Sequence, residues 1–71
     1  MSSTAPNLTE VVAQRVALRT GRRVRNLTIE VGNGWLRLRG SAPSYHVKQL
    51  AQHAAGEAVP AARLENAIVV E

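Results

Sequence analysis

A tight turn between two alternating segments constrains the fold of this chain most strongly. Gly32-Asn33-Gly34 accepts the positive φ angles that a short hairpin connection requires. Apolar and polar residues alternate over residues 27–31 before this turn and again over residues 35–39 after it. The pattern predicts a β-hairpin whose second strand ends at Gly40.

Two segments with helical periodicity flank the predicted hairpin. The first is expected over residues 8–20, because Asn7 fits an N-cap, apolar residues recur every fourth position, and Gly21 is a typical C-terminal stop. The second is expected over residues 44–57, ahead of Pro60, with Tyr45 packing over its first turn. The two apolar stripes consist of Leu8, Val11, Val12 and Val16, and of Val47, Leu50, Ala51, Ala54 and Ala58.

A third strand over residues 64–70 completes the order α-β-β-α-β. This order predicts an α+β fold with two helices packed on one face of a three-stranded mixed sheet. The third strand should lie parallel to the second through a right-handed crossover, and the other sheet face should stay open. Residues 1–6 are predicted to be a disordered leader and residues 7–71 a single domain. The expected sheet core is Leu27, Ile29, Val31, Leu36, Leu38, Ile68 and Val70.

The residue types available argue against catalysis and metal binding. The 71-residue chain has no Cys and no Asp, and its five Glu are scattered. His46 and His53 are seven residues apart, about 10.5 Å along a helix, so they cannot share one metal ion. Gly32, Gly34 and Gly40 flank strands and do not lead into a helix, so they are expected to form turns and not a phosphate loop. We expect a protein that is not an enzyme and has no metal or cofactor.

The net charge of +4 is unevenly distributed. Seven arginines stand against two glutamates in residues 1–40, whereas residues 41–71 hold two cations against three glutamates. A basic half of this kind attracts phosphate-rich surfaces, either nucleic acid or anionic lipid. The simpler alternative is a solvated basic surface that only aids solubility.

The hairpin residues resemble a known bacterial family. Residues 27–31, followed by Asn33-Gly34-Trp35-Leu36-Arg37-Leu38-Arg39-Gly40, are similar to the hairpin of the BON domain, a module named for osmotic-stress and nodulation proteins. The segment Lys48-Gln49-Leu50-Ala51, with Val59, Leu64, Asn66, Ile68 and Val70, resembles its second half. The resemblance covers about residues 8–71. It departs at Ala61-Ala62, where the family usually has Gly-Val.

The resemblance implies an αββαβ fold, a non-catalytic role, and attachment to anionic phospholipid or another envelope component. It also implies an envelope or periplasmic location. The sequence itself shows neither a signal peptide nor a transmembrane segment, so it predicts a cytoplasmic protein.

Two candidate contact surfaces follow from the predicted fold. Trp35, Arg37 and Arg39 should share the open sheet face, although Trp35 alone is equally suited to packing within the hairpin. Arg22, Arg23 and Arg25 form a second cationic segment. The expected partner is an anionic phospholipid surface or an envelope-linked protein. Protein interaction or self-association is the first alternative. Non-specific nucleic-acid binding is the second, weakened by the lack of a second aromatic for stacking.

Overall fold

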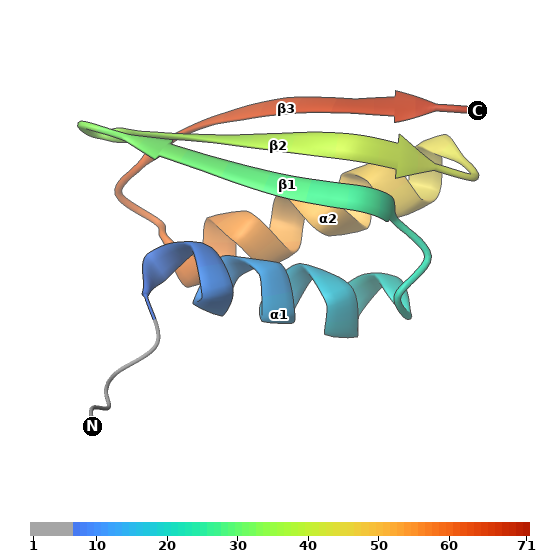
Figure 1. Ribbon diagram of the computed structural model, residues 1–71, viewed down its shortest axis with the longest axis horizontal. Coiled ribbons are helices and arrows are strands. Elements are labelled where there is room, and N and C mark those ends of the chain that lie inside the picture. Colours follow the sequence, from blue (N-terminus) through green and yellow to red (C-terminus); the bar gives the residue numbers. More distant parts are fainter. Residues whose placement is uncertain (1–6) are drawn as a thin grey trace.

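A computed structural model describes residues 7–71 and has the predicted αββαβ order (Figure 1). The elements are α1 Leu8–Thr20, β1 Arg25–Gly32, β2 Trp35–Ala42, α2 Tyr45–Ala58 and β3 Arg63–Val70. The leader predicted over residues 1–6 lies outside the described residues. The α+β fold class is confirmed.

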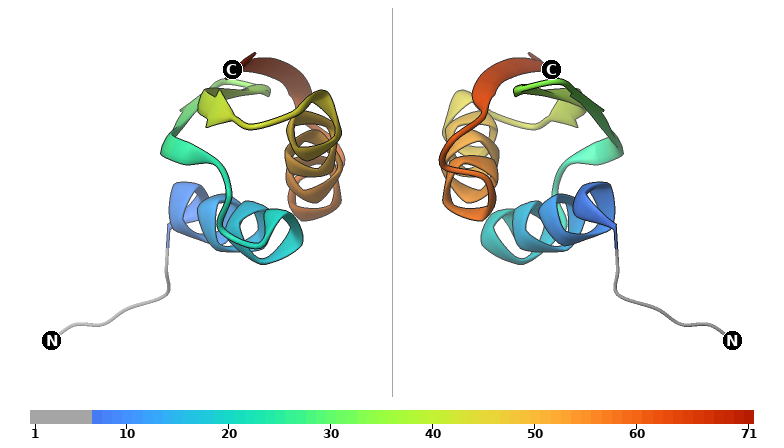
Figure 2. Two further views of the ribbon diagram at one scale, coloured as in Figure 1. Left: turned by 90° about the vertical axis from the view of Figure 1, so that its right-hand side faces the viewer. Right: turned by 90° about the vertical axis from the view of Figure 1, so that its left-hand side faces the viewer.

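The sheet has the order β1-β2-β3, so the central strand is β2. β1 pairs with β2 antiparallel as a hairpin, and β3 pairs with β2 parallel, as predicted. Both helices lie on the same side of the sheet (Figure 2). α2 packs against β2 and β3, whereas α1 packs against α2 and β1. Among residues 7–71, no element covers the opposite face of the sheet.

Side-chain caps set the helix boundaries. The Asn7 side chain accepts a hydrogen bond from the Glu10 backbone N–H at 2.9 Å, and Gly21 ends α1 with a φ of 65°. The Ser44 hydroxyl accepts from the Val47 N–H at 3.3 Å. Because Ser44 is the cap and has an extended backbone, α2 begins one residue later than predicted.

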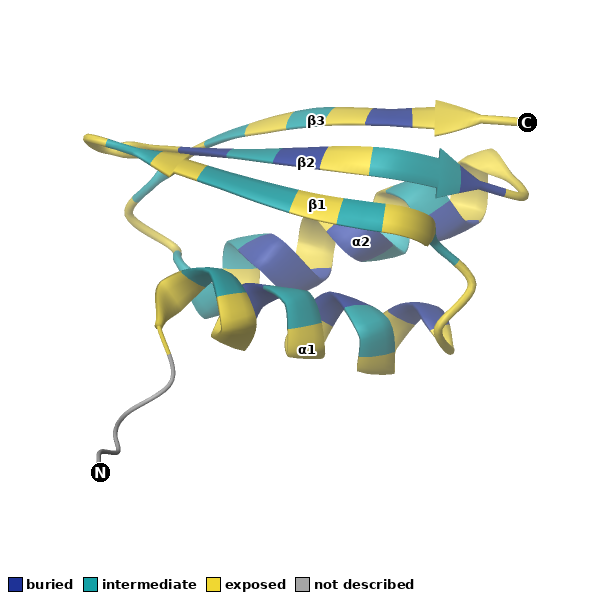
Figure 3. Ribbon diagram, in the orientation of Figure 1, coloured by how far each residue is buried: buried dark blue, intermediate teal, exposed yellow. Residues whose placement is uncertain are grey.

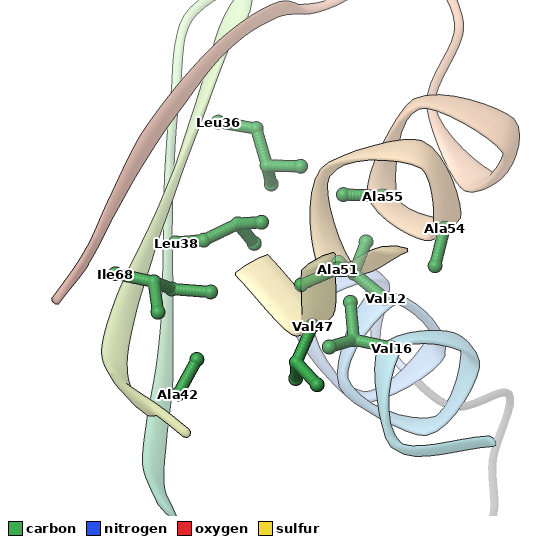
Figure 4. Packing of buried hydrophobic residues seen from close by; sticks show 10 residues of the cluster. All are labelled: Val12, Val16, Leu36, Leu38, Ala42, Val47, Ala51, Ala54, Ala55 and Ile68. Atoms are coloured by element: carbon green, nitrogen blue, oxygen red, sulfur yellow. The ribbon is translucent and has the colours of Figure 1, made fainter. Parts of the chain in front are cut away.

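The core lies between the sheet and the two helices (Figure 4). β2 supplies Leu36 and Leu38, which are fully buried because β2 has a strand on either side and helices beneath it. Small residues on α2 let that helix approach the sheet closely. The buried apolar residues are Val12, Val16, Leu36, Leu38, Ala42, Val47, Ala51, Ala54, Ala55 and Ile68, with Leu27 and Ile29 packed against them.

The predicted core was wrong at the ends of the edge strands. Val31 is 41% exposed and Val70 is 42% exposed, and both lie near the ends of outer strands, which have a neighbouring strand on one side only (Figure 3 colours the strands by burial). Leu8 and Val11, at the start of α1, are also exposed. Tyr45 does not pack over α2, since most of its surface faces solvent.

Gly40 does not end the second strand, which continues to Ala42. The register of β1 against β2 shifts between Arg25 and Thr28, and Asn26 has a φ of 54° within this bulge. Gly40 faces the bulge with a φ of 151°, and a Cβ there would lie 2.7 Å from the Arg25 carbonyl oxygen. Gly40 is thus needed for a close backbone approach and not for a turn.

Candidate anion-binding surfaces

The open face of the sheet carries the first predicted contact surface. Trp35, Arg37 and Arg39 alternate with the buried Leu36 and Leu38, so all three lie on the face away from the helices. Their predicted grouping on one face is confirmed. Whether this face binds anything remains a prediction.

Two carboxylates already engage Arg37. Its Nη1 donates to Glu30 Oε1 on β1 at 3.0 Å, and its Nε donates to Glu65 Oε1 on β3 at 3.1 Å. These two strands lie on either side of β2 (Figure 1). The hydrogen bond to Glu65, followed by that to Glu30, raises the pKa of Arg37 above its ordinary value. One cation thus stands between two carboxylates across three strands. Because these two carboxylates match its charge, Arg37 offers little attraction to an external anion.

Trp35 stacks on its cross-strand partner, Gly32. A Cβ at Gly32 would lie 2.0 Å from the indole Cε2, so the ring occupies the space that a side chain would need. The Arg37 guanidinium carbon lies 5.3 Å from the ring centroid, within cation–π range. Trp35 is still 37% exposed. These contacts support packing within the hairpin, and a binding role for Trp35 stays a prediction.

An apolar hollow of about 200 Å³ lies beside Trp35. We call this region, with the hairpin turn, the hairpin end of the molecule. Its lining comes from the start of α1, the hairpin and the α2–β3 connection, which meet at the left of Figure 1. The lining residues are Leu8, Val31, Gly32, Gly34, Trp35, Leu36, Val59, Ala61 and Ala62.

The second predicted surface lies at the opposite end of the sheet. Arg22, Arg23 and Arg25 border a hollow of about 540 Å³, which Ala42, Pro43 and Glu71 complete. We call these six residues the basic end. Arg22 and Arg23 come from the connection between α1 and β1, at the right of Figure 1, and Arg25 is the first residue of β1. Gly21 and Arg22 both have left-handed φ angles, which turn the chain sharply from the helix into the strand.

The three arginines of the basic end keep their charges available. Arg23 Nε donates to the Thr20 carbonyl oxygen at 3.0 Å, which ties its side chain to the C-terminal end of α1. Within residues 7–71, none of Arg22, Arg23 and Arg25 forms an ion pair with a carboxylate. The three arginines border one hollow, and their role as a contact surface remains a prediction.

Other arginines are matched within the molecule. Arg15 and Arg19 on α1 both pair with Glu57 on α2, Arg15 at 3.6 Å, so they join the two helices. Arg39 is exposed and makes no ion pair among the described residues. The sequence alone gave no means of separating paired from unpaired cations, because Glu57 is 38 residues from Arg19.

A third hollow, of about 560 Å³, runs between α1 and β1 and was not predicted. Ala13 and Ala17 face it from α1, and their small side chains leave the space open. Leu18 stands on its rim and is 70% exposed. The only signal for this hollow in the sequence is the pair of alanines four residues apart, which lies beside the larger apolar stripe of the same helix.

Both histidines are exposed on α2. In the part of the chain that the structure describes, no three His, Cys, Asp or Glu side chains come close enough together to hold a metal ion. Neither α1 nor α2 has the length and apolar character needed to cross a bilayer.

Comparisons of the chain with protein-family models, with curated proteins and with solved structures gave no match. The resemblance to the BON domain therefore remains a prediction made from the sequence.

Proposed function

We propose that this domain is a non-catalytic binding module that associates peripherally with anionic phospholipid surfaces through its basic end. One observation carries the proposal. Arg22, Arg23 and Arg25 border a single hollow and have no carboxylate partner among residues 7–71, whereas Arg15, Arg19 and Arg37 are all ion-paired. A surface that leaves one cluster of cations unmatched is suited to an external anion.

The expected affinity for an anionic bilayer follows from the number of arginines at the basic end. Each cation close to an anionic bilayer contributes about 1 kcal/mol, so three contribute about 3 kcal/mol, or roughly a hundredfold in affinity. This attraction falls off within a Debye length of about 8 Å at physiological salt, so the distant cations add little. The resemblance to the BON domain supports the same class of partner, including an envelope-linked location.

The open face of the sheet is less suited than the basic end to binding anionic lipid. Arg39 forms no ion pair among residues 7–71, but Arg37 is held between Glu30 and Glu65. Two carboxylates repel a negative surface there, whereas one carboxylate, Glu71, stands beside the three arginines of the basic end. We therefore place Arg39 and Trp35 at the margin of the contact and the basic end at its centre.

Co-sedimentation with vesicles tests the proposal. The protein is mixed with neutral phosphatidylcholine vesicles or with vesicles that also contain phosphatidylglycerol, in about 0.15 M salt, with and without an excess of duplex DNA. We expect sedimentation only with the anionic vesicles and no effect of the DNA. Equal sedimentation with both vesicles, or none with either, would contradict the proposal. Displacement by DNA would favour nucleic-acid binding in its place.

A further inference from the structure

The two edges of the sheet differ in how well they are protected from further pairing. β1 carries a bulge and a left-handed residue, Asn26, and both interrupt the regular row of backbone groups that a new strand would need. β3 pairs with β2 without any shift in register over eight residues and contains neither Pro nor Lys. An edge of this length without a bulge or Pro is open to pairing with another strand.

The backbone hydrogen bonds show which groups of β3 face outward. The Arg63 N–H donates to the Gly34 carbonyl at 2.9 Å, and the Glu71 N–H donates to the Ala42 carbonyl at 2.9 Å. Alternate residues of a strand direct their N–H and C=O groups to opposite sides, so the odd-numbered residues face β2. The even-numbered residues Leu64, Asn66, Ile68 and Val70 direct theirs to the free edge.

We propose that β3 pairs antiparallel with β3 of a second copy of this chain, about a two-fold axis at Ala67. The two three-stranded sheets then join into one sheet of six strands, with both open faces on the same side. Arg63 of each copy lies opposite Glu71 of the other, and Leu64 lies opposite Val70. All four outward residues of each strand find a backbone partner.

Charge complementarity selects this register. Arg63 and Glu71 are both exposed, lie at opposite ends of the same face of the strand, and form no ion pair among residues 7–71. A shift by two residues in one direction sets Glu65 against Glu71, which are like charges. A shift in the other direction sets Arg63 against an apolar side chain, Val69, and loses backbone pairs.

The pairing also covers apolar surface that the single copy leaves exposed. Val69 is 60% exposed and Val70 is 42% exposed. Val70 follows the alternation of a core residue, and Leu64 of the second copy would supply the neighbour that it lacks. One hydrogen bond of the single copy must be exchanged when the two copies pair. The Ile68 N–H donates to Asn66 Oδ1 at 3.1 Å in the single copy and would turn to the Asn66 carbonyl of the other.

A cysteine at the two-fold axis tests the geometry. Ala67 is exposed and would meet itself across the axis at a non-hydrogen-bonded site, where Cβ atoms are close enough for a disulfide. Because the chain has no Cys, Ala67→Cys introduces a single thiol. Thr28→Cys on β1 is the matched control, exposed on the same sheet face. We expect Ala67→Cys to form a disulfide-linked dimer at least tenfold faster under mild oxidation. Equal rates for the two variants would overturn the proposal.

A charge exchange tests the register independently of any lipid. Sedimentation equilibrium of the unmodified chain should show a concentration-dependent dimer. Arg63→Glu should raise its dissociation constant at least tenfold, and adding Glu71→Arg should restore it. Arg39→Glu, with the same charge change on β2, should leave the constant within twofold. A strictly monomeric parent chain, or a double variant as weak as Arg63→Glu, would overturn the proposal. Vesicle binding by a monomer would leave the proposed function standing.

Discussion

The two ends of the sheet use arginine in opposite ways. Towards the hairpin end, Arg37 lies against Trp35 and between Glu30 and Glu65, so its charge is matched inside the molecule. At the basic end, Arg22, Arg23 and Arg25 border a hollow without an ion pair among the described residues. The same residue type is therefore paired with carboxylates of the sheet in one place and unpaired among the described residues in the other, where we propose that it contacts an anionic partner.

This difference shows why net charge alone is a poor guide to a binding surface. Seven of the nine cations lie in residues 1–40 and suggest one broad basic half. Ion pairs then remove Arg15, Arg19 and Arg37 from that half, and three of the four arginines that remain lie at the basic end. Surface ion pairs contribute little to stability, but they decide which charges stay available.

The largest effect is expected from the core that joins the two ends. Leu38→Asp places an unpaired charge at a fully buried position of the central strand and should cost about 4 kcal/mol or more, comparable with the whole stability of a domain this small. Val31→Asp, at the exposed hairpin end, should cost only about 1–2 kcal/mol. Thermal unfolding followed by circular dichroism measures both. A cooperative transition of Leu38→Asp near that of the parent would show that the core is wrongly assigned.

A smaller effect is expected where Trp35 rests on Gly32. Gly32→Val fills the space that the indole occupies, so the ring must leave the strand surface, at a cost of about 1–3 kcal/mol. Because the chain has one Trp, its fluorescence emission should shift to longer wavelength as the ring enters water. Gly56→Ala is the control, since a Cβ there meets no atom within 4 Å and helix α2 gains up to about 1 kcal/mol. Unchanged emission in Gly32→Val would refute the stacked position.

The smallest effect is expected when single arginines are removed from each end. Arg25→Gln should weaken binding to anionic vesicles about fivefold, the equivalent of about 1 kcal/mol. Arg37→Gln should change it by less than about twofold, because that guanidinium is already bonded to two carboxylates. Vesicle titration with fluorescently labelled protein measures both. A larger loss from Arg37→Gln than from Arg25→Gln would move the contact to the open face.

Most of the fold could be predicted from local patterns. All five elements are predicted to within a few residues by local signals. These are the Gly32-Asn33-Gly34 turn, the Asn7 and Ser44 caps, and the strand and helix periodicities of the apolar residues. Gly40 was misread because the bulge opposite it, at Asn26, has no signature in the sequence. Val31 and Val70 were misplaced because alternation identifies the face of a residue but not how far a helix extends over it.

The candidate site could be predicted only in part. Adjacent arginines, such as Arg22 and Arg23, are visible in the sequence, and the alternation of β2 placed Arg37 and Arg39 on one face. The pairing of Arg37 with Glu65 depends on strand register, and that of Arg19 with Glu57 depends on how two helices meet. Such contacts between distant segments decide which cations are free, and they come only from the folded chain.

Exchanging three arginines at a time tests the contrast between free and paired charge most directly. One variant replaces Arg22, Arg23 and Arg25 with Gln, and the other replaces Arg15, Arg19 and Arg37, so both lose the same net charge. Affinity for anionic vesicles is measured in about 0.15 M salt, after thermal melts confirm that both variants fold. The first variant should bind about a hundredfold more weakly than the parent, and the second should bind nearly as well as the parent. Equal losses in the two variants would show that only the total charge matters and would contradict a contact at the basic end.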